Sequence, residues 1–327
     1  MSTSQSFYAD AVLFDMDGTL TDSIQAVEAA WGKVAKEIGQ DPAKVIAATH
    51  GKRAIDNLAE FKPHIKAHEM DDEVAKFEES ILYFADAYSL HGPGSSRGSA
   101  AGPLASGQMF LSALSSSVGT PSLTPDASSS SSRASSITAS QTRRPSFISR
   151  LSERLMRISL EDETVEEDDN VINANELEAW QVEAASVDRS VRILPGVKKM
   201  IDSLPEGRYA VATSGAKTYA YGCMTRVGIT PPPVTITADD KRLKAGKPAP
   251  DPFLLAAKCL GYDASKCVVF EDSPSGIRAG VASGATVIAV CTSHERSQIE
   301  NCGAHYIVEN MESVSCEFEG GKLKFTS

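Results

Sequence analysis

Two aspartates, Asp15 and Asp17, stand one residue apart in the segment DMDGTLTDS at residues 15–23. They follow the apolar run 11–14, which has the composition of a buried strand. Aspartate, glycine and threonine are also common in turns and at helix starts, so the pair alone does not distinguish a turn from an active site. The distinction depends on which other groups the chain brings to the same place.

Other polar groups follow further apolar runs in the second half of the chain. They are Thr213, Ser214 and Gly215 after one run, Glu271 and Asp272 after another, and Lys247 between the two. If these runs are strands of a parallel sheet, their carboxyl ends meet at the edge where such sheets bind ligands. Helix caps alone do not explain several polar strand ends at one edge.

The chemistry that suits these groups is phosphoryl transfer. An aspartate is ionised at neutral pH and can attack phosphorus without a separate base, so we assign the nucleophile to Asp15. A second carboxylate can protonate the leaving oxygen and then deprotonate the attacking water, and this general acid/base role is assigned to Asp17. The product of the first step is an aspartyl-phosphate, which water then opens.

Carboxylates packed together need a cation between them. Hard oxygen ligands favour Mg²⁺, and the predicted ligands are Asp15, Asp17 through its carbonyl, and Asp272, with Glu271 in or near the coordination shell. Ser214 and the neighbouring backbone of Thr213 and Gly215 are predicted to hold phosphate oxygens. Lys247 is predicted to neutralise the phosphate and the nucleophile together.

Strands and helices alternate after Leu194, which predicts a parallel sheet covered by helices on both faces. With residues 11–14, the predicted strands are 209–213, 234–237, 267–270, 286–290 and 305–308. The predicted helices are 195–204, 216–227, 252–260 and 274–283, with Pro195, Pro252 and Pro274 in their first turns. The fold class is therefore α/β with a doubly wound parallel sheet.

Residues 20–88 form a helical block in which no strand is predicted. The segment 21–39 places Ile24, Val27, Trp31 and Val34 at helical spacing, with Asp22 or Ser23 as the helix cap. Further helices are predicted at 43–49, 53–61 and 71–88.

Residues 89–172 are predicted to be a largely disordered insert, because the Ser-rich part cannot bury enough apolar surface to offset its ordering entropy. Within it, the segment 147–158 has an apolar helical face among arginines. It suits a docking or membrane-surface helix, or more simply a helix that packs on its own domain. Arg143 and Arg144 precede Ser146, which is a candidate phosphorylation site for a protein kinase that prefers basic residues.

The composition sets limits on the partners. The chain has 327 residues, 42% of them hydrophobic, and a formal charge of −11, which disfavours nucleic acid and anionic membranes. No apolar stretch is long enough to span a membrane, and the six cysteines form no C-x-x-C pair. We therefore expect a cytoplasmic monomer with reduced thiols that acts on a small phosphorylated substrate.

The motifs DMDGT, Thr213-Ser214, Lys247 and the pair Glu271-Asp272 occur in the order found in the haloacid dehalogenase-like hydrolases, which the chain resembles. The segments HGKRAIDNLAEF, LPGVKKMIDSLP, YAVATSG and AGKPAPDPFL are similar to its glycerol-phosphate and 2-deoxyglucose-6-phosphate phosphatase branch. The resemblance implies a Rossmann-like catalytic core of residues 1–19 and 190–327. It also implies a mobile helical cap of residues 20–88 and about 173–189, and the site roles given above.

The function that this resemblance implies is a Mg²⁺-dependent phosphatase for small polyol or sugar phosphates. Within the cap, Lys52 and Arg53 stand where related caps present side chains that contact substrate, although solvated surface charges are an equal alternative. A hexose-phosphate mutase uses the same aspartates, and a regulatory protein that acts through its insert belongs to a different class. Both alternatives stay open at this point.

Overall fold

The computed structural model describes residues 6–92 and 180–326, which all belong to one compact unit. Most of the predicted insert, the basic segment 147–158 and Ser146 lie outside the described residues. Among the described residues, no helix is both long enough and apolar enough to cross a membrane.

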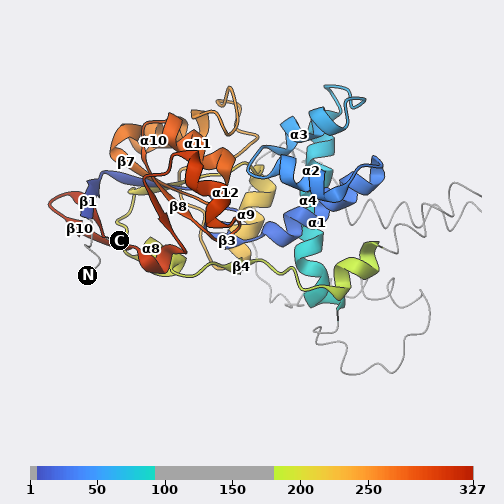
Figure 1. The fold of residues 1–327 in the computed structure, drawn as a ribbon, viewed down its shortest axis with the longest axis horizontal. Helices are drawn as coiled ribbons and strands as arrows, with labels where there is room; N and C mark the ends of the chain where they lie inside the picture. The colour runs from blue at the N-terminus through green and yellow to red at the C-terminus, as the bar shows by residue number, and fades with distance from the viewer. Residues whose placement is uncertain (1–5, 93–179, 327) are drawn as a thin grey trace, which may run out of the picture. The chain divides into compact units, whose positions relative to one another are not determined.

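A six-stranded parallel sheet forms the centre of the fold (Figure 1), in the order β6-β5-β2-β7-β8-β9. Its strands are β2 (Ala11–Phe14), β5 (Tyr209–Ala212), β6 (Thr235–Ile236), β7 (Cys267–Glu271), β8 (Thr286–Val290) and β9 (Tyr306–Val308). The chain runs outward from β2 to β5 and β6, then returns to the other side of β2 as β7. The strand order therefore reverses at β2, and the predicted doubly wound sheet is confirmed.

Alternate residues of the buried strands face two separate cores. In β2, Val12 and Phe14 belong to one apolar cluster, while Ala11 and Leu13 belong to the other. Helices α8 (Val197–Asp202) and α9 (Lys217–Arg226) supply the first cluster, and α10 (Asp251–Leu260) and α11 (Pro274–Ala282) supply the second. Burying a large side chain such as Phe14 contributes about 1.5–3 kcal/mol, so the two clusters fix the strand that carries Asp15.

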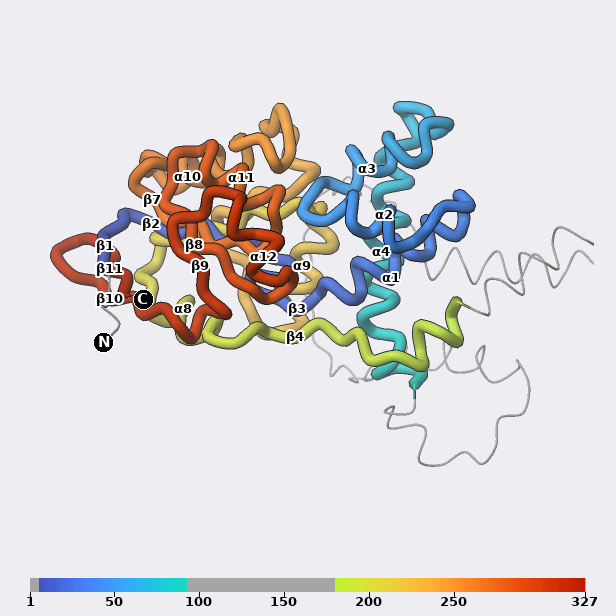
Figure 2. Tube along the Cα trace, viewed as in Figure 1, coloured from blue at the N-terminus to red at the C-terminus, as the bar shows by residue number. Residues whose placement is uncertain are grey.

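The helical block consists of four helices that lie together beside the sheet (Figure 2). They are α1 (Ile24–Glu37), α2 (Pro42–Thr49), α3 (Ala54–Phe61) and α4 (Met70–His91). The rings of Trp31 in α1 and Phe77 in α4 pack at a tilt of 40°, with centroids 4.1 Å apart. Trp180, in a helical stretch at 180–186, packs against Tyr83 of α4 at 4.9 Å. The predicted helices are confirmed, and α4 continues three residues beyond the predicted end.

The start of the helical block differs from the prediction. Thr21–Asp22 form a short strand, β3, that pairs antiparallel with β4 (Arg192–Ile193), so the expectation of no strand between residues 20 and 88 was wrong. A two-residue pairing between distant segments has no periodicity that a sequence pattern can reveal. Helix α8 also begins after Pro195, because Gly196 adopts a left-handed φ of +81° directly before it.

A second sheet joins the two ends of the described chain. Its strands β1 (Ser6–Ala9), β11 (Lys322–Thr326) and β10 (Ser315–Glu319) are antiparallel, in that order. Phe7 of β1 stacks on Phe325 of β11 at 5.4 Å. The remaining short elements are α12 (Arg296–Ile299) and the 3-10 turns Ala264–Lys266, Glu300–Cys302 and Met311–Ser313. None of these elements was predicted.

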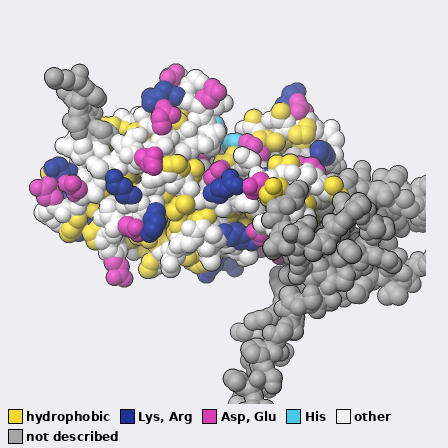
Figure 3. Space-filling view, turned by 90° about the horizontal axis from the view of Figure 1, so that it is seen from below, with side chains coloured by type: hydrophobic (Ala, Val, Ile, Leu, Met, Phe, Trp, Pro, Cys, Tyr) yellow, Lys and Arg dark blue, Asp and Glu magenta, His cyan; other side chains and the backbone are white. Residues whose placement is uncertain are grey.

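The surface charges are mixed in sign on the face shown in Figure 3. Basic and acidic side chains of the described residues alternate there with apolar ones, without a large patch of either sign. The net charge of −11 is therefore not concentrated on this face.

Candidate active site

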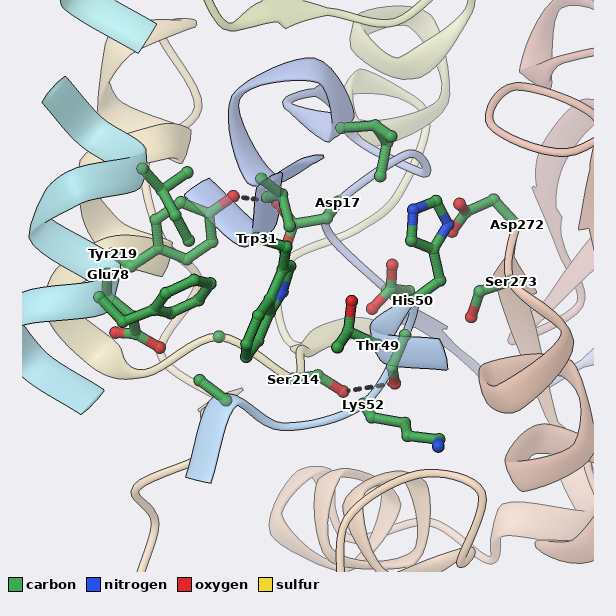
Figure 4. Close-up of a pocket in the computed structure, with 18 of the residues that line it drawn as sticks. Asp17, Trp31, Thr49, His50, Lys52, Glu78, Ser214, Tyr219, Asp272 and Ser273 are labelled. Atoms are coloured by element: carbon green, nitrogen blue, oxygen red, sulfur yellow. Dashed lines mark hydrogen bonds between the residues drawn. The ribbon is translucent and has the colours of Figure 1, made fainter. Parts of the chain in front are cut away.

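A pocket lies between the carboxyl edge of the parallel sheet and the helical block (Figure 4). The core lines it with Asp15, Asp17, Ser214, Gly215, Tyr219, Asp272, Ser273 and His294, and the helical block with Ile24, Val27, Trp31, Thr49, His50, Gly51, Lys52, Ala54, Phe77, Glu78 and Ile81. The backbone N–H of Asp15 donates to the Phe270 carbonyl at 3.0 Å, which extends the pairing of β2 with β7 to the pocket edge. The strand reversal at β2 thus places Asp15 where α/β sheets bind ligands.

Lys247 lies between two carboxylates, Asp15 and Glu271. Its Nζ donates to Asp15 Oδ1 and, at 2.8 Å, to Glu271 Oε1, and all three side chains are buried. Burial opposes the charged ammonium, but the two carboxylates raise the pKa of Lys247 above its usual value. Lys247 therefore stays protonated and holds Asp15 in place.

Asp15, Glu271 and Asp272 form a buried acidic cluster. Each offers an oxygen, and these oxygens lie within 4.8 Å of one another. Burial raises the pKa of Asp15 to about 7, Lys247 opposes this effect, and Glu271 and Asp17 add to it. The pKa of Asp272 is raised well above its usual range by burial and then by Glu271 and Asp15. Such crowding of desolvated carboxylates is relieved by a divalent cation with oxygen ligands.

Glu271 is hydrogen-bonded through both carboxylate oxygens. Oε1 accepts from Lys247, while Oε2 accepts from the backbone N–H groups of Asp272 at 2.8 Å and Ser273 at 2.9 Å. Gly276 leaves the room for this arrangement, because a Cβ there would lie 1.4 Å from Glu271 Oε1. The geometry suits a residue that positions Lys247 and the turn after β7.

Asp272 contacts the segment DMDGT, which follows β2. Asp272 accepts from Thr19 Oγ1 at 3.0 Å and from Ser293 Oγ. Gly18 has a φ of +75°, and a Cβ at this position would lie 2.2 Å from Asp272 Oδ2. Glycine is required there because the backbone takes a left-handed conformation and passes close to the carboxylate.

Asp17 is held by two hydroxyl groups. Tyr219 at the start of α9 and Ser23 before α1 both donate to Asp17 Oδ1. Burial raises the pKa of Asp17, and the hydrogen bonds from Ser23 and Tyr219 oppose that increase. Ser23 occupies the cap position of α1, as one of the two predicted candidates, but its hydroxyl makes no side-chain cap bond. It instead connects the helical block to Asp17.

The loop after β5 contacts the helical block twice. Ser214 Oγ donates to the Gly51 carbonyl at 2.9 Å, and the backbone N–H of Ala216 donates to Glu78 Oε1 at 2.6 Å. Within the loop, Thr213 Oγ1 accepts from the Gly215 N–H at 3.0 Å. Ser214 and Gly215 face the pocket, as phosphate-binding groups would have to.

Lys52 and Arg53 differ in position. Lys52 is exposed and lines the pocket, where Figure 4 shows its side chain at the edge. The guanidinium of Arg53 pairs with Asp56 at 2.8 and 2.9 Å, and its side chain packs against Gly246. Arg53 is not among the residues that line the pocket.

Several residues of the site were not predicted as such from the sequence. Tyr219, His50, His294, Trp31 and Glu78 line the pocket, and Ser293 donates a hydrogen bond to Asp272, which lines it. Nδ1 of His50 and Nε2 of His294 are 3.4 Å apart, and Nδ1 of His294 lies 2.7 Å from Ser293 Oγ. Burial and the neighbouring His50 lower the pKa of His294. Trp31 and Glu78 carried a usable signal: Trp31 lies on the apolar face of one predicted helix, and Glu78 stands three residues before Ile81 on the apolar face of another.

The model of one protein family, haloacid dehalogenase-like hydrolase, matches residues 9–284. Glycerol-1-phosphate phosphohydrolase 2 of Saccharomyces cerevisiae is 37% identical over 150 residues, which cover 43% of this chain and only 58% of that protein. The yeast 2-deoxyglucose-6-phosphate phosphatase 1 is 25% identical over 319 residues, 94% of this chain and 91% of its own. Hexitol phosphatase A of Escherichia coli is 26% identical over 280 residues, which cover 85% of this chain and 81% of that protein.

Solved structures show the same fold at low identity. A hydrolase from Pseudomonas syringae aligns with a TM-score of 0.53 at 17% identity, covering 93% of this chain and 94% of its own. A β-phosphoglucomutase from Clostridium difficile aligns with a TM-score of 0.52 at 15% identity, covering 93% and 92%. A hydrolase and a mutase thus share this architecture, so the fold alone does not select between the two reactions.

Proposed function

Because the chain belongs to the haloacid dehalogenase-like hydrolases, we propose that it is a phosphatase that hydrolyses small polyol or sugar phosphates through an aspartyl-phosphate. The observation that carries this proposal is the contact of Lys247 with Asp15, beside the acidic cluster and at the reversal of strand order. Relatives named as phosphatases of glycerol, deoxyglucose and hexitol phosphates support the substrate class.

In the first step, a carboxylate oxygen of Asp15 attacks the phosphorus. The new Asp15–phosphorus bond forms as the ester P–O bond breaks, and Asp17 donates its proton to the departing alkoxide. The raised pKa of Asp17 suits a group that carries this proton at the start. Ser23 and Tyr219 hold the Asp17 carboxyl while the alcohol leaves.

In the second step, water attacks the phosphorus of the aspartyl-phosphate. Asp17, now a carboxylate, takes a proton from the water, and the bond between Asp15 and phosphorus breaks. Inorganic phosphate leaves and Asp15 returns to its initial state. Throughout both steps, Ser214 and the loop N–H groups hold phosphate oxygens, and Lys247 neutralises the charge beside Asp15.

Mg²⁺ fits the acidic cluster. Three buried carboxylates offer oxygens within 4.8 Å of one another, and the pKa values of Asp15 and Asp272 are raised, so the cluster provides the hard, anionic donors that this ion takes. Asp15 and Asp272, with the Asp17 carbonyl, would hold the ion, and Glu271 would position its neighbours. When bound, the ion screens the negative charge of the phosphate from Asp15.

We also propose the division into a core of residues 1–19 and 190–327 and a cap of residues 20–88 and about 173–189. Two observations support it: the antiparallel pair β3–β4 lies where the chain leaves and re-enters the core, and Trp180 packs on α4. The hydrogen bonds Ser214–Gly51 and Ala216–Glu78 connect the two parts across the pocket. Lys52 is proposed to meet the phosphorylated substrate from the cap side.

The test is phosphate release from a panel of esters that contains glycerol 3-phosphate, 2-deoxyglucose 6-phosphate and glucose 6-phosphate. The wild-type protein is expected to release phosphate from at least one ester with Mg²⁺ and to lose this activity with a chelator. Asp15→Asn is expected to be inactive, whereas Asp10→Asn, which changes a carboxylate just before β2, should retain activity. Isomerised sugar phosphate without release of inorganic phosphate would contradict hydrolysis.

A further inference from the structure

Besides Asp15, Asp17 and Asp272, the pocket contains a further carboxylate that the two steps above do not use. Glu78 lies on α4, its side chain lines the pocket, and the residue is only 4% exposed. Figure 4 shows it on the opposite side of the pocket from Asp272 and Ser273. A buried acid at that end requires an explanation, because an isolated carboxylate in an apolar site is costly.

Only one oxygen of Glu78 has a hydrogen-bond partner among the described residues. Oε1 accepts from the Ala216 N–H at 2.6 Å, which fixes the carboxyl group against the loop after β5. Oε2 has no hydrogen bond within the described part of the chain, yet it is not one of the atoms sealed from solvent without a partner. Since Glu78 lines the pocket, Oε2 is free to accept a hydrogen bond from a molecule bound there.

The charges around Glu78 are negative. Burial raises its pKa to about 8, and the nearby carboxylates Asp239 and Asp17 raise it further, against the effect of the Ala216 N–H. No lysine or arginine of the described residues contributes to this shift. Among the described residues that line the pocket, Lys52 is the one lysine or arginine, and it forms no ion pair with Glu78, so the Glu78 end does not offer the cation that a bound phosphate group requires.

Apolar side chains complete this end of the pocket. Trp31 and Phe77, whose rings are 4.1 Å apart, line it together with Val27 and Ile81. Carbon atoms of a sugar or polyol can pack on these surfaces while a hydroxyl group reaches the carboxyl group. The combination suits an uncharged, hydroxylated group and opposes a second anion.

We propose that Glu78 determines specificity: it accepts a hydrogen bond from a hydroxyl group at the non-phosphorylated end of the substrate and excludes a second phosphate. The substrate class is therefore the monophosphates of polyols or sugars, and sugar bisphosphates are rejected. This inference rests on the proposed phosphatase activity and deepens it. It also argues against the mutase alternative, because a mutase must rebind a bisphosphate within the same pocket.

The experiment compares two three-carbon esters, glycerol 3-phosphate and n-propyl phosphate, which differ in their hydroxyl groups. For Glu78→Ala, kcat/KM for glycerol 3-phosphate is expected to fall by about 10- to 100-fold, because the substrate hydroxyl loses its buried hydrogen-bond partner. For n-propyl phosphate, the expected change is within about threefold, since no hydroxyl group reaches Glu78. Glu79→Gln is the matched control, since Glu79 is the next residue of α4 and does not line the pocket.

A second measurement uses the more conservative Glu78→Gln and a hexose 1,6-bisphosphate as a competitive inhibitor. At about pH 9, where Glu78 with its pKa of about 8 is ionised, removal of the charge is expected to strengthen inhibition by about tenfold, while Glu79→Gln leaves it unchanged. Equal losses for both three-carbon esters, or unchanged inhibition, would overturn the inference and leave Glu78 as a structural contact with Ala216. If the wild-type protein hydrolyses no ester at all, the proposed function itself fails, and that outcome is distinct from either of these.

Discussion

The two sides of the pocket differ in how their charged groups are engaged. On the core side, Asp15, Lys247 and Glu271 form a continuous buried network in which Lys247 contacts both carboxylates. On the helical side, Glu78 makes one hydrogen bond and Lys52 is exposed. The reacting groups are therefore fixed by several mutual contacts. The groups proposed to meet the rest of the substrate make few contacts with other side chains. Substitutions on the two sides should therefore have different consequences.

The largest effect is expected from Asp15→Asn. An amide cannot replace the carboxylate as a nucleophile, so kcat should fall by at least about 10⁴-fold. The measurement is steady-state phosphate release with saturating substrate and Mg²⁺. A loss below about tenfold would mean that Asp15 is not the nucleophile.

Lys247→Met should mainly reduce stability. It leaves Asp15 and Glu271 buried without their cation, and breaking a buried ion pair in this way costs about 3–5 kcal/mol of unfolding free energy. Urea unfolding in chelator at neutral pH measures this loss. Lys322→Met is the control, because Lys322 is exposed and lies 4.0 Å from Asp10, where a surface pair contributes about 0–1 kcal/mol. Equal losses of unfolding free energy for Lys247→Met and Lys322→Met would contradict the difference expected between the buried and the surface ion pair.

Glu78→Gln should change how stability depends on pH. The pKa of Glu78 is raised from 4.5 to about 8 in the folded protein, so its carboxyl group favours the folded state below pH 4.5 and loses this contribution as the pH rises to about 8. Glutamine resembles the protonated form at every pH. The variant should therefore match the wild type near pH 4.5 and become more stable toward pH 8, by a few kcal/mol at most.

Urea midpoints at several pH values measure this difference, because the other titrating groups are shared and cancel. A difference between Glu78→Gln and the wild type that stays constant with pH would show that the Glu78 carboxyl is not desolvated.

The smallest effect is expected from Lys52→Ala. Lys52 is exposed, so its attraction for an anionic substrate is screened, and KM should rise by about three- to tenfold with kcat nearly unchanged. Arg53→Ala is the matched control, since Arg53 is paired with Asp56 and does not line the pocket. A larger rise in KM for Arg53→Ala than for Lys52→Ala would assign the substrate contact to Arg53 instead.

Much of the core side could be predicted from the sequence, because Asp15, Thr213 and Glu271 lie at or directly after the carboxyl ends of apolar strands. That topology brings them together without any knowledge of side-chain contacts. By contrast, Tyr219 and Ser293 donate hydrogen bonds to Asp17 and Asp272, which are 202 and 21 residues away in the chain. No local pattern marks such residues.

The missed antiparallel sheet has a different cause. Gly320 and Gly321 have φ values of +59° and +83° and separate two alternating segments, which is a recognisable signal for a two-residue hairpin. Its partner strand β1 lies at the other end of the chain, and that pairing is not visible in the sequence.

Glu78 shows most clearly what the sequence cannot predict. Its helix was predicted, but its position opposite the reacting groups depends on how α4 packs against the loop after β5.

The central claim is that Asp15 carries the phosphoryl group, and it can be tested by trapping that intermediate. An aryl phosphate is used as the substrate, because its leaving group departs without the proton that Asp17 supplies. In the Asp17→Asn variant, attack by water loses its general base, so the aspartyl-phosphate should accumulate after mixing with this ester and Mg²⁺. Acid quenching, digestion and mass spectrometry should then find one phosphate on Asp15 within the peptide that contains DMDGT, with the variant's asparagine at position 17. Release of inorganic phosphate without any label on Asp15, or a label on another residue, would contradict the mechanism.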